Sequence, residues 1–182
     1  DVLVPSFWKA FPGGKGVCLI IVTSLYHQDA DRVFQDINAY WAVATMAKEA
    51  TKVDEKAENP RGMILLSGLP LQDLVRLYKS VDVFVLPSRG EGWGRPYMEA
   101  MAMGLPVIAT NWSGPTEFLD NDHGYLLPIR GLVDANLEAF PNHKWADPDP
   151  KELERLLKHV VNHPAEAKQK VKRARQVVVN QW

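Results

Sequence analysis

PSRGEGWGRPYMEAMAMGLPVIATNWSG, residues 87–114, contains two glutamates, three glycines at alternate positions and an apolar tract near its end. It overlaps the apolar run VDVFVLPS (81–88), which has the composition of a buried strand, and it contains a second such run, LPVIATN (105–111). Pro96 suits the first position of a helix and Gly104 the position just after its end, so PYMEAMAM is predicted to be helical. The segment therefore predicts a strand, a glycine-rich turn, a helix and a second strand in succession.

Further apolar runs and amphipathic segments extend this pattern towards the N-terminus. VCLIIVT (17–23) and GMILLSG (62–68) are continuous rather than alternating, as expected for parallel strands that are covered on both faces. Residues 29–50 and 70–80 carry apolar side chains at helical spacing. The alternation predicts an α/β fold, a doubly wound parallel sheet with right-handed crossovers. The length favours a single domain over residues 1–182.

The C-terminal third is predicted to contain one strand, a long loop and two helices. GYLLPI (124–129) is the last strand-like run, and the loop continues from there as far as Asp149. Asp149 as N-cap, Pro150 at the first helical position and Glu152 two residues later form a capping box, which predicts the start of a helix. The tail AEAKQKVKRARQVVVNQW is predicted to be a basic helix whose charges are solvated, a commoner arrangement than a phosphate-binding face.

The composition excludes several classes of protein. With 46% hydrophobic and 24% charged residues, the chain is typical of a globular protein rather than a disordered or coiled-coil one. A net charge of -1 gives no reason to expect nucleic acid or an anionic membrane as a partner. The sequence has neither a long apolar segment nor a signal-peptide pattern, so we expect a cytoplasmic protein without a membrane span. The single cysteine, Cys18, excludes an internal disulfide and is predicted to be a small buried hydrophobe.

Two glutamates flank the glycine-rich turn, which is the most informative chemical feature of the chain. Gly90, Gly92 and Gly94 let the backbone approach a ligand closely, and the helix N-terminus beyond them favours an anion. In open α/β sheets, ligands bind at the carboxyl ends of strands, where this turn lies. Glu91 and Glu99 beside an anion site fit a ligand that also presents hydroxyl groups, such as a sugar or ribose, because carboxylates only accept hydrogen bonds. A purely structural interpretation of Glu99, as a buried carboxylate near the helix dipole, leaves Glu91 unexplained.

This run resembles the donor-binding signature of the retaining glycosyltransferases of family 4, which have the two Rossmann-like domains of the GT-B arrangement. The signature is a glutamate, seven residues and a second glutamate, and EGWGRPYMEAMAMGLPVIAT matches it closely. SGPTEFL and GYLL continue the pattern, and weaker similarity runs from LIIVT to WADPDPKELERLL. The resemblance implies the Rossmann-like donor half of an enzyme that moves a hexose from a UDP- or GDP-linked sugar to an unknown acceptor with retention, using neither cofactor nor metal.

The resemblance implies a role for each residue that matches the signature. Glu99 would hold the ribose hydroxyls of the nucleotide sugar. Glu91 would lie beside the donor sugar as the catalytic residue, bonding its hydroxyls and stabilising positive charge at the anomeric carbon. The backbone amides of Gly92, Trp93 and Gly94 would face the sugar and the diphosphate, with Trp93 as a possible lid or sugar platform.

Further candidate site residues lie around the glutamate signature. Arg95 would assist the diphosphate or else pair with Glu91, which the spacing does not distinguish. The residues after the strand 105–111 would line the cleft or instead form a turn into a helix capped by Ser113 or Thr116. The nucleobase would lie near the end of the strand 62–68. The candidate cleft residues are Asn111, Ser113 and Gly114, and the candidate nucleobase residues are Ser67, Gly68 and Leu69.

Two family features have no counterpart in the sequence. Family members grip the diphosphate with an arginine and a lysine just before the first helix of the donor domain, and bind the acceptor with an N-terminal domain. The chain starts at Asp1, and LVPSFWKAF (3–11) is predicted to be that first helix. We therefore expect both features to lie outside these residues, and the isolated chain to transfer little or no sugar.

Three other functions are compatible with a doubly wound fold. A dinucleotide-dependent oxidoreductase requires a G-x-G-x-x-G turn after its first strand, and none occurs. A non-catalytic nucleotide-sugar-binding module would be expected to lose Glu91 or Glu99, and both are present. A GT-B phosphorylase or synthase shares the donor-site logic and stays an alternative. His159 and His163 have the spacing of two metal ligands on one helical face, but no third ligand follows at a useful spacing, so no metal is expected.

Overall fold

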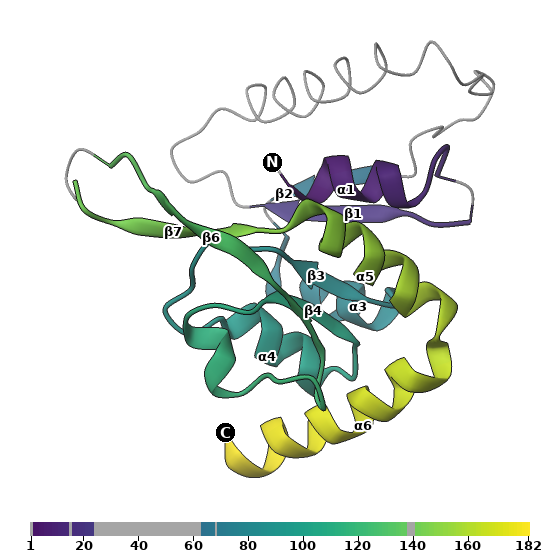
Figure 1. Ribbon diagram of the computed structural model, residues 1–182. Coiled ribbons are helices and arrows are strands. Elements are labelled where there is room, and N and C mark those ends of the chain that lie inside the picture. The colour runs from purple at the N-terminus through teal and green to yellow at the C-terminus, as the bar shows by residue number, and fades with distance from the viewer. Residues whose placement is uncertain (1, 15, 24–62, 68, 138–140) are drawn as a thin grey trace. The chain divides into compact units, whose positions relative to one another are not determined.

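The computed structural model is shown in Figure 1. It divides into two compact units, Leu3–Leu74 and Val75–Trp182, and the single domain predicted over 1–182 stays a prediction. The helix predicted over 29–50 lies outside the described residues. The structure describes residues 2–14, 16–23, 63–67, 69–137 and 141–182.

The first unit contains helix α1 (Leu3–Ala10) and two paired strands, β1 (Leu19–Thr23) and β2 (Met63–Ser67). The strands are parallel, and each lies within an apolar run that predicted it. Helix α1 confirms the helix predicted over 3–11. Cys18 is exposed, so the prediction of a buried thiol is wrong: the residue precedes the strand instead of contributing to its apolar face.

The second unit is built on a parallel sheet of three strands in the order β3-β4-β5. These strands are β3 (Phe84–Leu86), β4 (Val107–Thr110) and β5 (Tyr125–Leu127). Every residue of β4 is buried, so the side chains on both faces of this central strand are covered. Such burial explains why the run 105–111 is apolar without alternation. The strands predicted over 81–88, 105–111 and 124–129 are therefore confirmed, although each is shorter than its apolar run.

Helices α3 (Leu71–Ser80) and α4 (Arg95–Ala102) supply side chains that pack with this sheet. Helix α4 packs against β3 and β4, and helix α3 contributes Tyr78 to the same core. The rings of Tyr78 and Phe84 lie 6.0 Å apart, and Phe84 meets Tyr97 edge to face at 5.8 Å. Burying an aromatic or large aliphatic side chain contributes roughly 1.5–3 kcal/mol, so this row of rings secures α4 on the sheet.

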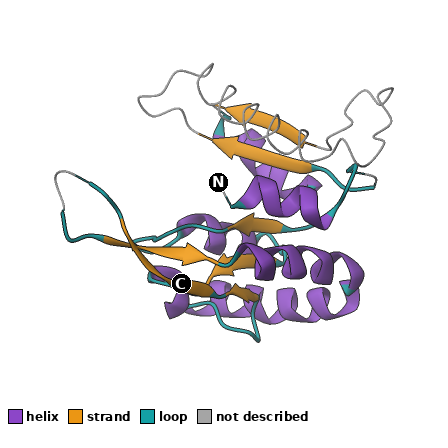
Figure 2. Cartoon of the chain, turned by 45° about the horizontal axis from the view of Figure 1, so that its top comes forward, coloured by secondary structure: helices purple, strands orange, loops and turns teal. Residues whose placement is uncertain are grey.

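An antiparallel hairpin replaces the long loop that the sequence predicted after residue 129. Strands β6 (Ile129–Asp134) and β7 (Lys144–Pro148) pair with an irregular register near Gly131, whose φ is +151°. The hairpin runs out beyond the three-stranded sheet (Figure 2). Most of β6 is exposed, so its sequence carries no buried face and no period of two. The prediction of a loop was wrong for that reason.

Two helices complete the second unit. Helix α5 (Pro150–Asn162) follows the N-cap Asp149, whose carboxylate accepts hydrogen bonds from the N–H groups of Lys151 at 2.8 Å and Glu152 at 3.2 Å. The helix start is confirmed, but only half of the capping box forms. The Asp149 N–H donates instead to the carbonyl of Pro128 at 3.0 Å, which ties the helix start to the end of β5.

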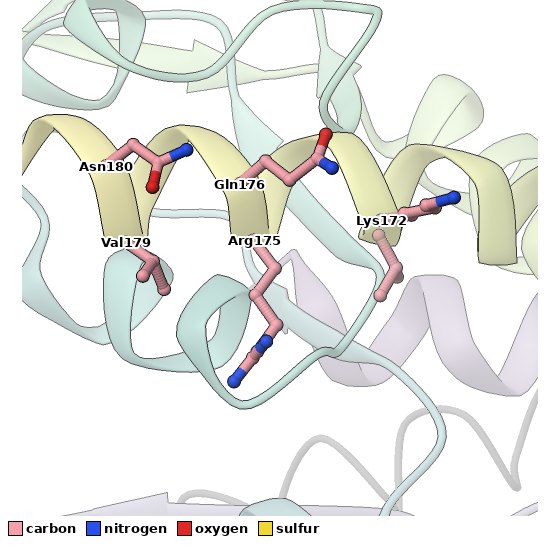
Figure 3. A pocket seen from close by; sticks show the side chains of 6 residues that line it. Lys172, Arg175, Gln176, Val179 and Asn180 are labelled. Carbon is pink, nitrogen blue, oxygen red and sulfur yellow. The ribbon is translucent and has the colours of Figure 1, made fainter.

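Helix α6 (Pro164–Gln181) confirms the predicted basic helix but not its purely solvated charges. Arg175 Nε donates to the carbonyl of Ala102 at 3.0 Å, and Arg173 Nε donates to that of Asp122 at 2.9 Å. Figure 3 shows the Arg175 side chain leaving α6 beside a surface hollow of about 320 Å³. These cations satisfy carbonyl groups at the end of α4 and in a turn, as cations near helix C-termini do.

Replacement of Asp149 by alanine is expected to lower the free energy of unfolding by about 1 kcal/mol, because two backbone N–H groups lose their acceptor. Asp149→Asn keeps an oxygen in place and is expected to retain most of the stability. Urea unfolding of the three proteins, followed by circular dichroism, measures both effects. A loss as large for asparagine as for alanine would contradict the capping role.

Candidate functional site

Two loops meet at one edge of the three-stranded sheet. The loop 87–94 follows β3 and the loop 111–113 follows β4, and the carboxyl ends of neighbouring parallel strands lie at the same edge. The N–H of Glu91 donates to Ser113 Oγ at 3.0 Å. The N–H of Gly114 donates to the carbonyl of Glu91 at 3.2 Å. The main chain of Glu91 is thus held on both sides by the loop after β4.

Two glycines make this junction possible. A Cβ atom on Gly114 would lie 2.5 Å from the carbonyl oxygen of Gly92, so no side chain fits there. Gly94 has a φ of +93° at the N-cap position of α4, and a Cβ on it would lie 2.6 Å from the Tyr97 ring. Gly90 and Gly92 face open space. The backbone at Gly90 and Gly92 is therefore approachable, whereas Gly94 is buried. That this turn faces a ligand stays a prediction.

The buried Tyr97 side chain holds the start of the loop after β3. The Tyr97 hydroxyl donates to the carbonyl of Leu86 at 2.7 Å and lies 2.9 Å from Ser88 Oγ. Thr110 Oγ1 donates to the carbonyl of Ser88 at 2.7 Å. Burial raises the pKa of Tyr97 to about 12, and the negative charge of Glu91 adds to this effect. Sequence analysis missed this network, whose only signal is a tyrosine on an apolar helix beside hydroxyl residues at two strand ends.

Glu99 is not buried, contrary to the prediction. Its side chain is 41% exposed, because it lies away from the face of α4 that packs on the sheet. That face is formed by Tyr97, Ala100 and Met101. The apolar composition of α4 suggested burial on all sides, but Glu99 itself marks the side of the helix that meets solvent.

The Glu99 carboxylate has two neighbours that orient it. The Tyr78 hydroxyl donates to Oε2 at 3.4 Å, and Arg95 Nη2 lies 3.9 Å from Oε1. Burial, together with the charge of Glu99 and the hydrogen bond to it, raises the pKa of Tyr78 to about 12. The alternative in which Arg95 pairs with Glu91 is not observed. The Arg95 side chain is 85% exposed, so solvent screening keeps its pairing with Glu99 weak.

The Glu91 carboxylate differs from that of Glu99. It forms neither a hydrogen bond nor an ion pair with any residue of the described ranges, although its backbone is held at both N–H and carbonyl. Its acceptor oxygens are consequently left for donors from outside this group of residues.

The hairpin also anchors the loop after β3. The Ala146 N–H on β7 donates to the carbonyl of Arg89 at 2.9 Å. The Arg89 guanidinium lies over the Trp145 ring, 6.0 Å from its centroid. The loop after β3 is thereby held by a segment that was predicted to be a loop.

Trp93 packs against other side chains at the rim of the site. Its ring centroid lies 5.3 Å from that of Phe118 and 4.8 Å from that of Trp182. Its Nε1–H donates to Met98 Sδ at 2.8 Å. The role of Trp93 as a lid or sugar platform stays a prediction, and the structure adds a packing role to it.

The residues after β4 do not form a side-chain-capped helix. A single 3-10 turn, Gly114–Glu117, follows Ser113, and the Ser113 hydroxyl serves Glu91 instead of this turn. Thr116 Oγ1 donates to the carbonyl of Ser113 at 2.7 Å. Asn111 is exposed, and its N–H continues the ladder to the carbonyl of Leu127 at 2.8 Å. Ser113 and Gly114 therefore form hydrogen bonds with the main chain of Glu91. Asn111 bonds Leu127 instead.

The predicted nucleobase segment belongs to the first unit. Ser67 ends β2, Leu69 follows it before α3, and Gly68 lies outside the described residues. Their assignment to a nucleobase stays a prediction.

The histidine pair is occupied by protein contacts. The rings of His159 and His163 stack with centroids 4.1 Å apart. His159 Nε2 lies 2.8 Å from Glu166 Oε2, and this hydrogen bond lowers the pKa of Glu166. Within the described ranges, no three His, Cys, Asp or Glu side chains are grouped to hold a metal ion. No helix among these residues has both the length and the apolar character needed to cross a membrane.

Comparison with known proteins identifies the family. Residues 24–141 match the family described as glycosyl transferases group 1, which is more than half of the chain. The protein therefore belongs to the glycosyl transferases group 1 family, in agreement with the glutamate signature.

Curated relatives match parts of the chain. The chain is 37% identical over 93 residues to a D-inositol 3-phosphate glycosyltransferase from Corynebacterium aurimucosum, covering 50% of this chain and 19% of that protein. It is 46% identical over 77 residues to O-antigen chain mannosyltransferase B from Escherichia coli, covering 42% and 17%. It is 40% identical over 78 residues to a probable sucrose-phosphate synthase from Thermosipho melanesiensis, covering 40% and 18%. The match thus spans less than a fifth of each of these relatives.

Solved structures share the fold. A glycosyltransferase from Rickettsia africae superposes with a TM-score of 0.70 at 19% identity, covering 98% of this chain and 38% of that one. Anabaena HepE, solved in complex with UDP-glucose, superposes with a TM-score of 0.69 at 15% identity, covering 99% and 40%. These neighbours share the fold of the chain, and the predicted α/β fold with a parallel sheet is confirmed.

The raised pKa of Tyr97 predicts a pH-dependent loss of stability. Its folded pKa of about 12 lies above the ordinary value of 10.0, so the unfolded chain loses this proton first. The stabilising contribution is complete below pH 10 and is lost as the pH rises from about 10 to 12. Between about pH 9 and 11.5, unfolding free energy should fall by about 2 kcal/mol more in the wild type than in Tyr97→Phe. Urea unfolding at both pH values measures the difference, and parallel losses in the two proteins would refute it.

Proposed function

We propose that this chain is the donor-binding part of a retaining glycosyltransferase of family 4, and that it binds a UDP- or GDP-linked hexose at the carboxyl ends of β3 and β4. The proposal rests mainly on Glu91. Ser113 and Gly114 fix its backbone, while its carboxylate is unpaired among the described residues. Family membership and the fold shared with a UDP-glucose complex support the proposal.

In this proposal Glu91 acts on the donor sugar. An ionised carboxylate accepts hydrogen bonds from sugar hydroxyls and stabilises positive charge as it develops at the anomeric carbon. A rigid backbone at Glu91 suits this task, because preorganised charge costs little reorganisation during the reaction. The amides of Gly92, Trp93 and Gly94 would face the sugar and diphosphate.

Glu99 would bind the ribose. Its carboxylate is partly exposed, and Tyr78 and Arg95 restrict its orientation from two sides. A carboxylate with two oxygens suits a pair of adjacent hydroxyl donors. Arg95, which is mostly exposed, would supply positive charge to the diphosphate.

The reaction would break the bond between the anomeric carbon and the diphosphate oxygen and form a bond to an acceptor hydroxyl oxygen on the same face. The diphosphate leaves with the bonding electron pair, and the acceptor hydroxyl gives up its proton to the oxygen of the leaving diphosphate. The nucleotide sugar is a substrate, and the proposal includes no cofactor or metal. The acceptor would be bound by residues outside this chain, which spans less than half of the solved transferases.

A synthase of the same architecture is a second candidate. The 40% identity to a probable sucrose-phosphate synthase favours it, because such an enzyme differs in acceptor rather than in donor-site logic. A non-catalytic nucleotide-sugar-binding module would bind the donor without turnover in the full-length protein.

Substitution of each glutamate should affect different ligands. Glu99→Gln is expected to weaken binding of both the nucleoside diphosphate and its sugar conjugate by about 10- to 100-fold, because a hydrogen bond to a charged group is lost. Glu91→Gln is expected to weaken binding of the sugar conjugate alone. Calorimetric titration with UDP, GDP and ADP and with their glucose or mannose conjugates measures both effects.

Glu117→Gln is the matched control, since Glu117 is an exposed carboxylate on the 3-10 turn, and it should bind like the wild type. Absence of saturable binding by the wild type at millimolar ligand would refute the donor-site assignment. Equal losses for UDP and UDP-glucose in Glu91→Gln would refute the separate roles.

The isolated chain is expected to turn over donor very slowly, because the acceptor half of the reaction lies outside it. Release of nucleoside diphosphate from UDP-glucose or GDP-mannose should stay below about 0.01 per second, against the 1 per second or more that is ordinary for enzymes. A coupled assay with simple sugar acceptors measures this rate. Transfer at an ordinary enzymatic rate would show that the acceptor site is complete within these residues.

A further inference from the structure

Ser113 adopts a backbone conformation that side chains disfavour. Its φ is 60° and its ψ is -151°, a combination that is populated almost only by glycine. Within the described ranges, only Ser113 and Asn136 are non-glycine residues with positive φ. Asparagine tolerates positive φ well, so Ser113 is the more unusual of the two. Strained residues of this kind persist when their surroundings hold them, and they cluster at functional sites.

The strained conformation has an identifiable result at the loop junction. It directs the Ser113 hydroxyl to the N–H of Glu91 at 3.0 Å. It also brings the next N–H, on Gly114, to the carbonyl of Glu91 at 3.2 Å. Glycine at position 113 would adopt the same backbone without strain, but it would leave the Glu91 N–H without its acceptor.

The turn itself does not require the Ser113 hydroxyl. Thr116 Oγ1 donates to the Ser113 carbonyl at 2.7 Å, and the Thr116 N–H donates to the same carbonyl at 3.0 Å. Gly114 keeps its close approach to Gly92 whatever side chain stands at 113. The hydroxyl group therefore acts on the segment that carries Glu91, whereas other contacts hold the turn.

We propose that Ser113 is a positioning residue for the donor sugar: its hydroxyl fixes the main chain of Glu91 and so aims the carboxylate. This inference rests on the proposed function, in which Glu91 binds the sugar. Small errors in the placement of such a group reduce its effect strongly. Serine at this position thus costs some local stability, and it orients Glu91.

Three variants separate positioning from stability. Ser113→Gly removes the hydroxyl and the strain together, Ser113→Ala removes the hydroxyl alone, and Ser80→Ala is the matched control. Ser80 lies at the exposed end of α3, where its hydroxyl bonds the carbonyl of Leu77. Each protein is titrated with UDP, GDP, UDP-glucose and GDP-mannose, melted by heat, and labelled for amide hydrogen exchange at Glu91 by NMR.

Ser113→Gly is expected to melt within about 2 °C of the wild type or above it, because the released strain offsets the lost hydrogen bond. The same variant should bind the preferred nucleotide sugar about 3- to 10-fold more weakly, with UDP or GDP affinity unchanged within about twofold. The Glu91 amide should exchange about 10-fold faster in both Ser113 variants than in Ser80→Ala.

Two results would overturn the proposal. One is unchanged exchange at Glu91 in Ser113→Gly, which would show that the hydroxyl does not hold this segment. The other is a parallel fall in melting temperature and in affinity for all ligands, which would make Ser113 merely structural. A wild-type chain that binds none of the ligands would instead refute the proposed function, and the exchange measurement still decides whether Ser113 fixes Glu91.

Discussion

The hydrogen bonds between Glu91 and the pair Ser113 and Gly114 are the contacts on which the site depends. They join residues 22 and 23 apart in sequence, and they are possible because β3 and β4 are parallel neighbours whose loops leave the same edge of the sheet. A glycine at 114 is compulsory, since the backbones of the two loops are in contact there. The fold thus positions Glu91 through hydrogen bonds to its main chain.

The burial of β4 and Tyr97 gives this junction a rigid base. The Tyr97 hydroxyl and Thr110 Oγ1 bond the carbonyls of Leu86 and Ser88, where the chain leaves β3. Unpaired carbonyls in a partly buried place would be costly, so these hydroxyls stabilise the end of the strand. The two glutamates consequently differ in kind: Glu91 has a fixed backbone and an unpaired carboxylate, while Glu99 stands on a helix with its carboxylate oriented by side chains.

Local patterns predicted the strands and helices that bury apolar runs, such as β4 and α4, because burial leaves a trace in composition. The hairpin of β6 and β7 could not be predicted in this way, since most of β6 is exposed and pairs with β7 without burying an apolar run of its own. Glu91 was recognised from its spacing to Glu99. The role of Ser113 was beyond sequence reasoning, because a hydroxyl whose partner is 22 residues away and a backbone with positive φ have no local signature. The exposure of Glu99 was misjudged because residue spacing alone did not show which side of α4 meets the sheet.

The aromatic contact between Trp93 and Trp182 joins the segment that matches the family to a residue outside it. The family match stops at residue 141, yet the tryptophan in the glutamate signature is covered by a ring that lies 41 positions beyond that point. Arg175, also beyond it, closes the end of α4. A fragment trimmed to residues 24–141 would keep every signature residue and lose these two contacts. The contacts that support the signature therefore extend beyond the segment that the family model matches.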